Sequence, residues 1–107
     1  MWYIFPQIAG LGMSYTAQLY AIKDIEEARQ YIAHPVLGAR LIEISNALLT
    51  LDCSDAAAVM GYPDDLKLRS CMTLFAQVSD DPVFDAVLAK FYGGTADART
   101  LELLSLT

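Results

Sequence analysis

The sequence predicts an all-α fold, a compact bundle of about six or seven short helices. Apolar residues recur at intervals of three and four along several stretches, which is the spacing of one buried helix face. Most of these stretches begin after Asp or Ser and end at Gly or before Pro, the usual start and stop signals of helices. No stretch alternates apolar and polar residues for long enough to predict a strand.

The segment that follows Pro63 carries the pattern around which we expect the other helices to pack. Pro63 favours the start of a new element, and the side chain of Asp64 or Asp65 is expected to cap its first turn. The expected buried face consists of Leu68, Cys71, Met72, Phe75 and Val78. The expected solvent face carries Asp65, Lys67, Arg69, Thr73 and Gln77.

Upstream of this central helix, the sequence predicts two helices that are capped by polar residues. Ser14 can cap a short helix over residues 15–21, and Asp24 can cap a helix that ends at His34-Pro35. The buried stripe of the second helix is expected to consist of Ile25, Ala28 and Ile32.

Two more helices are expected between Pro35 and Gly61. The longest periodic run follows Pro35, as a heptad-like seam of Leu37, Leu41, Ile44, Leu48 and Leu51. Ser54 or Asp55 then begins a small helix over residues 56–60, which Gly61 stops.

Two helices are expected after the central one. Asp81-Pro82 is a cap followed by proline at the first helical position, and Gly93-Gly94 ends the helix. Its apolar face is expected to hold Val83, Phe84, Val87, Leu88 and Phe91. Asp97 caps a last helix that carries Leu101 and Leu104.

Residues 1–13 are unusually aromatic and apolar for a chain terminus. Pro6, Gly10 and Gly12 interrupt any regular pattern, so we expect an irregular segment packed on the body. Exposed apolar surface near this segment would favour association, so a homo-oligomer is expected through that surface.

Composition limits the class of protein. The 107 residues fit one helical domain over residues 1–107, and 55% hydrophobic against 19% charged residues exclude a disordered chain. The formal net charge of −6 and the scattered Lys and Arg residues argue against nucleic acid as a partner. No uninterrupted apolar segment approaches the length of a membrane span, and no signal peptide is recognisable. We therefore expect a soluble, cytoplasmic protein.

The cysteines and the one histidine give no indication of a metal site or a cofactor. Cys53 and Cys71 stand in neither a C-x-x-C nor a zinc-binding spacing, and both are expected to be small core side chains of a reducing compartment. His34 is expected to cap the C-terminal end of a helix and to interact with its dipole.

A few residues are candidates for a functional site. Asp64 and Asp65 are weak candidates for a catalytic carboxylate, although helix capping explains one of the two equally well. The expected ligand-binding residues are aromatic, amide or cationic side chains, namely Trp2, Gln7, Tyr20, Lys67 and Arg69. Aromatic residues beside an amide can stack on and hydrogen-bond a planar ligand, and the cations can bind an anion; simple packing is the alternative for the aromatic residues.

Three blocks of sequence resemble the family known as domain of unknown function 1810. They are W-Y-I-F-P-Q at residues 2–7, Y-A-I-K-D-I-E-E-A-R-Q-Y-I-A-H-P-V-L-G at residues 20–38 and P-D-D-L-K-L-R-S-C-M-T-L-F at residues 63–75. The resemblance continues through D-P-V-F, F-Y-G-G and R-T-L-E-L-L at residues 81–84, 91–94 and 99–104. It implies a mainly helical protein without an established activity. Members usually carry a further helix upstream, so the resemblance implies that this chain lacks it.

A more distant likeness is to the NADAR family of N-glycosidases. It involves Ser14 and Tyr20, then Glu27-Ala28-Arg29, then Asp65-Leu66-Lys67-Leu68 and Met72, and finally Asp81-Pro82-Val83-Phe84 and Leu88. It implies hydrolysis of ribosylated substrates, with Asp64 or Asp65 as the carboxylate and with Tyr20 and Gln7 orienting the substrate. The glutamate expected two residues after the serine is replaced by Thr16. Three functions stay open: binding of a nucleotide-like or small anionic ligand, N-glycosidase-like hydrolysis, and a structural or oligomerisation module. Whether the protein is an enzyme is open as well.

Overall fold

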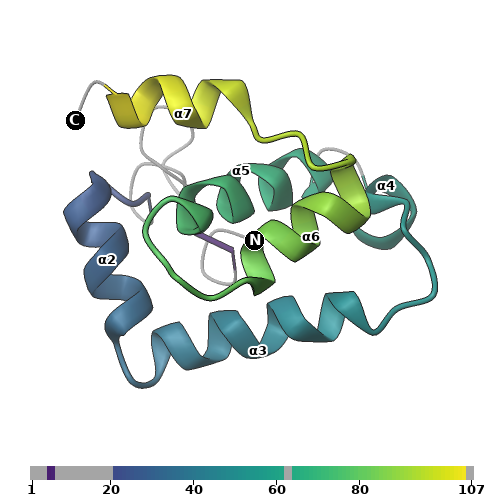
Figure 1. The fold of residues 1–107 in the computed structure, drawn as a ribbon, viewed down its shortest axis with the longest axis horizontal. Coiled ribbons are helices and arrows are strands. Elements are labelled where there is room, and N and C mark those ends of the chain that lie inside the picture. Colours follow the sequence, from purple (N-terminus) through teal and green to yellow (C-terminus); the bar gives the residue numbers. More distant parts are fainter. Residues whose placement is uncertain (1–4, 7–20, 62–63, 106–107) are drawn as a thin grey trace.

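The computed structural model describes residues 5–6, 21–61 and 64–105, and these residues form the predicted all-α fold (Figure 1). They contain six helices: α2 (Ile25–Ala33), α3 (Leu37–Leu49), α4 (Ala56–Met60), α5 (Asp64–Ala76), α6 (Val83–Tyr92) and α7 (Ala98–Ser105). Each of the six follows a helix predicted from the sequence to within a few residues. The helix expected over residues 15–21 and most of the irregular N-terminal segment lie outside the described residues.

Helix α5 lies at the centre of the bundle, as predicted, and packs against α2, α4, α6 and α7 (Figure 1). Its predicted inner face is confirmed at Leu68, Cys71, Met72 and Phe75, which are fully buried, whereas Val78 lies beyond the end of α5 and is only partly buried. The prediction that Thr73 faces solvent is wrong, since its side chain is also fully buried. A helix with neighbours on several sides buries more than one stripe, and α7 covers the side of α5 on which Thr73 lies.

Aromatic contacts join three helices in the core. The ring of Phe75, on α5, lies 5.5 Å from the ring of Tyr31 on α2 and 5.8 Å from the ring of Phe84 on α6, centroid to centroid. Tilted pairs at this spacing add about 0.5–1.5 kcal/mol beyond the burial of their area. Phe75 therefore holds the centre of the bundle together, as its position in the predicted stripe indicates.

Four aspartates act at helix starts as predicted. Asp24 accepts a hydrogen bond from the backbone N–H of Glu27 at 2.8 Å, and Asp55 accepts from the N–H groups of residues 57 and 58 at 3.0 and 3.3 Å. The carboxylate of Asp81 accepts from the N–H of residue 83 at 2.9 Å, beside Pro82, and Asp97 caps α7. Each cap satisfies N–H groups that have no partner inside the helix.

The end of α6 was predicted correctly from the sequence, whereas the start of α5 was not. Gly93 adopts a left-handed φ of 62° at the end of α6, and the N–H of Gly94 donates to the carbonyl of Leu88 at 2.9 Å, as expected for a glycine stop signal. In contrast, α5 already includes Asp64 and Asp65, so neither residue stands in the N-cap position that we predicted. The two residues that precede the helix, 62–63, lie outside the described residues.

His34 stands at the C-cap of α2, as predicted, where its backbone N–H donates to the carbonyl of Tyr31 at 3.2 Å. The side chain of His34 contacts the next helix instead. Its Nδ1 accepts hydrogen bonds from the backbone N–H groups of Val36 and Leu37, both at 3.1 Å, at the start of α3. The chain turns at Pro35, so the imidazole meets the unsatisfied donors of the next helix rather than the carbonyls of its own. The tight turn also brings Gly38 against α2, where a Cβ would lie 2.0 Å from the carbonyl oxygen of Ile32.

The predicted seam of α3 is confirmed only in its middle. Leu41 and Leu48 are buried, whereas Leu37 and Leu51, at the two ends, are 40% and 41% exposed. The buried residues of α3 are Gly38, Leu41, Ser45 and Leu48, so Leu37 lies off the buried face, Ile44 is only partly buried, and Leu51 lies beyond the end of the helix at Leu49. Ser45 lies inside the seam, fully buried, and its hydroxyl donates to the carbonyl of Leu41 at 2.7 Å.

The two cysteines have different environments. Cys71 is buried on α5 as predicted, but the prediction of a buried Cys53 is wrong, since this residue is exposed. Cys53 lies in the polar connection between α3 and α4, where its sulfur accepts from the N–H of Asp55 at 3.4 Å. Within the described part of the chain, no helix is long and apolar enough to cross a membrane.

Candidate functional site

Four of the predicted site residues lie on the first two turns of α5, and the structure separates them into two pairs. Asp64 and Lys67 form one pair and Asp65 and Arg69 the other, because residues three or four apart share a helix face while neighbours two apart do not. The other predicted ligand-binding residues, Trp2, Gln7 and Tyr20, lie outside the described residues.

The carboxylate of Asp65 has an unusual environment. Its Oδ1 atom is buried and has no hydrogen-bond partner within residues 5–6, 21–61 and 64–105. The backbone of the same residue is fully used, since its N–H donates to the carbonyl of Gly61 at 2.9 Å and its carbonyl accepts from the hydroxyl of Tyr92. A buried acceptor without a partner costs about 1–3 kcal/mol, so it calls for an explanation.

Arg69 connects α5 to the linker between α6 and α7. Its Nε donates to the carbonyl of Thr95 at 3.0 Å, and its Nη2 donates to the carbonyl of Ala96 at 3.1 Å. The guanidinium carbon lies 5.8 Å from the centre of the Tyr92 ring, a cation–π contact. No carboxylate of the described residues forms an ion pair with Arg69. A guanidinium has five N–H donors, so it keeps donors beyond those that hold the linker.

Tyr92 completes this cluster, and the sequence did not single it out. Its hydroxyl donates to the backbone carbonyl of Asp65, and its ring faces Arg69. Burial raises the pKa of Tyr92, the negative charge of Asp65 raises it further, and the positive charge of Arg69 opposes both. The phenol therefore remains a protonated donor at neutral pH. The sequence gave no signal for the contact between Tyr92 and Asp65, because the two residues lie 27 positions apart.

The pair of Asp64 and Lys67 is a surface ion pair. The Nζ of Lys67 lies 3.7 Å from Oδ1 of Asp64, and the two side chains are 35% and 43% exposed. A pair of this kind contributes about 0–1 kcal/mol, so the ammonium of Lys67 exchanges readily between Asp64 and other anions. The structure thus leaves Lys67 accessible but does not bring it to Arg69.

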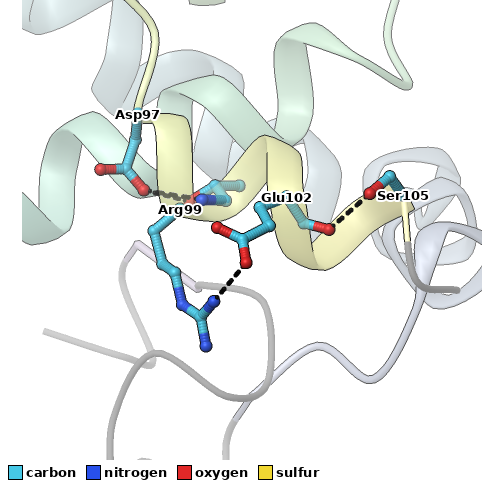
Figure 2. Close-up of polar contacts among 5 residues, drawn as sticks. Asp97, Arg99, Glu102 and Ser105 are labelled. Carbon is cyan, nitrogen blue, oxygen red and sulfur yellow. Dashed lines mark hydrogen bonds and ion pairs between the residues drawn. The ribbon is translucent and has the colours of Figure 1, made fainter.

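Further hydrogen bonds join α5 to the start of α7. The hydroxyl oxygen of Thr73 accepts from the N–H of Asp97 at 2.8 Å, and Oδ2 of Asp97 accepts from the N–H and the hydroxyl of Thr100 at 2.9 and 2.6 Å. Figure 2 shows Asp97 at the start of α7 and the Arg99 and Glu102 side chains directed towards each other. These two exposed side chains form an ion pair at 2.9 Å. The polar contacts of Thr73 and Asp97 therefore fix the start of α7 on α5.

The described residues contain no group of three or more His, Cys, Asp or Glu side chains that could hold a metal ion. The cluster that does form, here called the Asp65 cluster, consists of Asp65, Arg69 and Tyr92. It combines a buried free acceptor, a cation with unused donors and an aromatic ring. Chemically, this set can bind a molecule that offers both a hydrogen-bond donor and a negative charge.

Comparisons with known proteins agree with the resemblance seen in the sequence. A solved structure with the same fold is the crystal structure of the conserved hypothetical protein Rv1873 from Mycobacterium tuberculosis, with a TM-score of 0.96 and 46% sequence identity. The match covers 99% of this chain and 76% of that chain. No curated protein matches. The family model described as "Protein of unknown function (DUF1810)" matches residues 1–104. The likeness to the NADAR family stays a prediction, whereas the chain belongs to the DUF1810 family.

Proposed function

We propose that the protein binds a small nucleotide-like or other anionic ligand at the start of α5. The observation that carries the proposal is the buried Oδ1 of Asp65, which has no partner among the described residues. Native proteins retain few such atoms, and a bound ligand is one of the ordinary reasons for keeping one. In this proposal, Asp65 accepts a hydrogen bond from an N–H or O–H group of the ligand.

Arg69 supplies the complementary charge. It lies one turn after Asp65 on the same face of α5, and Tyr92 and the carbonyls of Thr95 and Ala96 hold its guanidinium in place. A positioned guanidinium loses little freedom when it binds a phosphate or carboxylate, which favours affinity. A nucleoside phosphate carries both required groups, because its sugar or base donates hydrogen bonds and its phosphate is negative.

The test is a thermal-shift screen followed by calorimetry on the full chain. The panel contains nucleosides, nucleoside phosphates, sugar phosphates and inorganic phosphate. Ligand that binds only the folded state raises the melting temperature in a saturable way. We expect at least one nucleoside phosphate to do so, and we expect its affinity to fall at least about tenfold in Asp65→Ala, where a ligand hydrogen bond is lost.

Asp64→Ala is the matched control, since it removes the neighbouring carboxylate that pairs with Lys67 at the surface. It should keep the affinity within about threefold, in line with the small contribution of an exposed ion pair. The proposal is wrong if no member of the panel shifts the melting temperature, or if both alanine variants bind as tightly as the wild type.

N-glycosidase-like hydrolysis of ribosylated substrates is a second candidate. The same observation favours it, because a carboxylate with a free oxygen is the group that such a reaction needs at the bond between sugar and base. Release of free base from a ribosylated substrate, measured by chromatography, would support it, provided that Asp65→Asn abolishes the release. Binding without release would leave the first proposal in place and exclude this one.

A structural or oligomerisation module is a third candidate, supported by exposed apolar residues. Val36 and Leu37 are 47% and 40% exposed, side by side at the start of α3. Light scattering at high concentration tests this candidate, and a strict monomer would exclude it.

The two free thiols fit a reducing compartment, so we propose that the protein lies in the cytoplasm.

A further inference from the structure

Three polar residues of α5 form a strip that another part of the chain covers. Asp65, Arg69 and Thr73 follow each other at intervals of four, so they lie in one row along the helix. We call these three residues the polar strip. The linker between α6 and α7 lies over it, because Arg69 donates to the carbonyls of residues 95 and 96 and Thr73 accepts from the N–H of Asp97.

The helix that follows this linker is attached weakly by apolar contacts. Among the described helices, α7 packs chiefly against α5. Thr100 is its one fully buried residue among those described, and Leu101 is 39% exposed. Leu103 and Leu104 pack against the core but are only partly buried. In contrast, α5 and α6 each bury several large apolar side chains completely. Elements with few buried apolar contacts open at lower free energy than the core.

The connection to α6 allows such an opening. Gly93 and Gly94 both have a left-handed φ, 62° and 80°, and a Cβ at either position would meet no atom within 4 Å. These glycines therefore serve the left-handed backbone conformation rather than a close approach. They separate a well-packed helix from a more lightly packed one.

We propose that residues 95–105, which comprise the linker and α7, form a strap that opens and closes as one unit over the polar strip. The strap is held closed mainly by the hydrogen bonds of Arg69 and Thr73. When it opens, α3, α5 and α6 stay folded, and the guanidinium of Arg69 and the hydroxyl of Thr73 become free to bind other molecules. The proposal goes beyond the ligand site proposed above and does not depend on it.

Native-state hydrogen exchange of the full chain, followed residue by residue, tests the strap. The amides of residues 101–105 should exchange with one common rate, at least about tenfold faster than the amides of α5 and α6. Thr73→Val removes the acceptor of the Asp97 N–H and should speed exchange in α7 by roughly threefold to tenfold. The exchange rates of α5 and α6 should change only by as much as the rate expected from global unfolding changes.

Arg69→Gln is the second variant, which keeps the test decisive if Thr73→Val does not fold. Thr50→Val is the matched control, because the exposed hydroxyl of Thr50 donates only to the carbonyl of Ala47 at the end of α3. It should leave exchange in α7 unchanged. The strap is excluded if α7 is as protected as α5 in the wild type, or if both variants speed exchange equally in α5, α6 and α7.

Discussion

The ammonium group of Lys90, on α6, donates a hydrogen bond of 3.1 Å to the backbone carbonyl of Leu48, near the end of α3. The same Nζ donates to the carbonyl of Leu49 at 3.1 Å and to that of Leu51. One side chain thus donates to three carbonyls at and just beyond the C-terminal end of α3, and its charge suits the negative end of the helix dipole. The contact ties the end of α3 to α6.

Lys90→Met is therefore expected to lower the free energy of unfolding by about 1–3 kcal/mol, because it removes a charged donor while leaving the carbonyls in place. Urea denaturation followed by circular dichroism measures the change. Lys23→Met is the matched control, since Lys23 is exposed before α2, and it should change stability by less than about 0.5 kcal/mol. Equal stability of the two variants would contradict a structural role for Lys90.

Gly38→Ala tests the close approach of α2 and α3. In an ordinary helix interior this substitution stabilises by about 1 kcal/mol. Here the new Cβ would lie 2.0 Å from the carbonyl oxygen of Ile32, a backbone atom that can move only with its helix. We expect a loss of about 1–3 kcal/mol or more in urea denaturation.

Asn46→Ala, on the exposed face of the same helix, is the control for helix propensity and should be close to neutral or slightly stabilising. The sign decides the outcome, because a Gly38→Ala protein more stable than the wild type would mean that the two helices do not touch as described.

The helix boundaries were predictable because their signals are local. The side chains of Asp24, Asp55 and Asp97 each accept a hydrogen bond from a backbone N–H two or three residues later. Sequence spacing alone therefore predicts these caps. Most of the buried residues of α5 and α6 were predictable for the same reason. The α3 seam was predictable only in part, because the buried face of this helix runs through Gly38, Leu41, Ser45 and Leu48, which leaves Leu37 exposed, and because Leu51 lies beyond the end of the helix.

The Asp65 cluster was only half predictable. The sequence marks Asp65 and Arg69 as polar residues at a helix start, but it does not show that Tyr92 and the carbonyl of Thr95 return to them from 26 or 27 residues away. The burial of Thr73 has the same origin, since it depends on the docking of α7. Such contacts follow from tertiary packing, which periodicity does not encode.

The two thiols are expected to react at very different rates. Cys53 is exposed, whereas Cys71 is fully buried and burial raises the pKa of its thiol well above the ordinary value, which suppresses the reactive thiolate. Ellman's reagent should therefore label one thiol quickly in the native protein and both thiols in denaturant. Cys53→Ser should remove the fast phase; a fast phase that persists would show that Cys71 is accessible.

Stability is expected to fall at alkaline pH through Tyr92. Burial raises the pKa of its phenol, and the charge of Asp65 adds to the effect against that of Arg69. The unfolded chain loses the phenolic proton near the ordinary pKa of about 10, while the folded protein still holds it. Stability from this group is thus fully present below about pH 10 and falls as pH rises towards the folded pKa, by less than the limiting slope of about 1.4 kcal/mol per pH unit, because solvent screens the half-buried phenol.

Tyr92→Phe separates this effect from others. The variant loses the hydrogen bond to the carbonyl of Asp65, which should cost about 1 kcal/mol at neutral pH, and it should also show a shallower decline between pH 10 and pH 11. Tyr31→Phe is the comparison, because burial also raises the pKa of Tyr31 and the nearby Cys71 adds to that effect. Urea midpoints measured at steps of pH from 8 to 11 give both slopes. If the stability of Tyr92→Phe falls with pH as steeply as that of the wild type, the phenol of Tyr92 titrates in the folded wild type as it does in the unfolded chain. In that case the buried contact with Asp65 that anchors the start of α5 does not exist in solution.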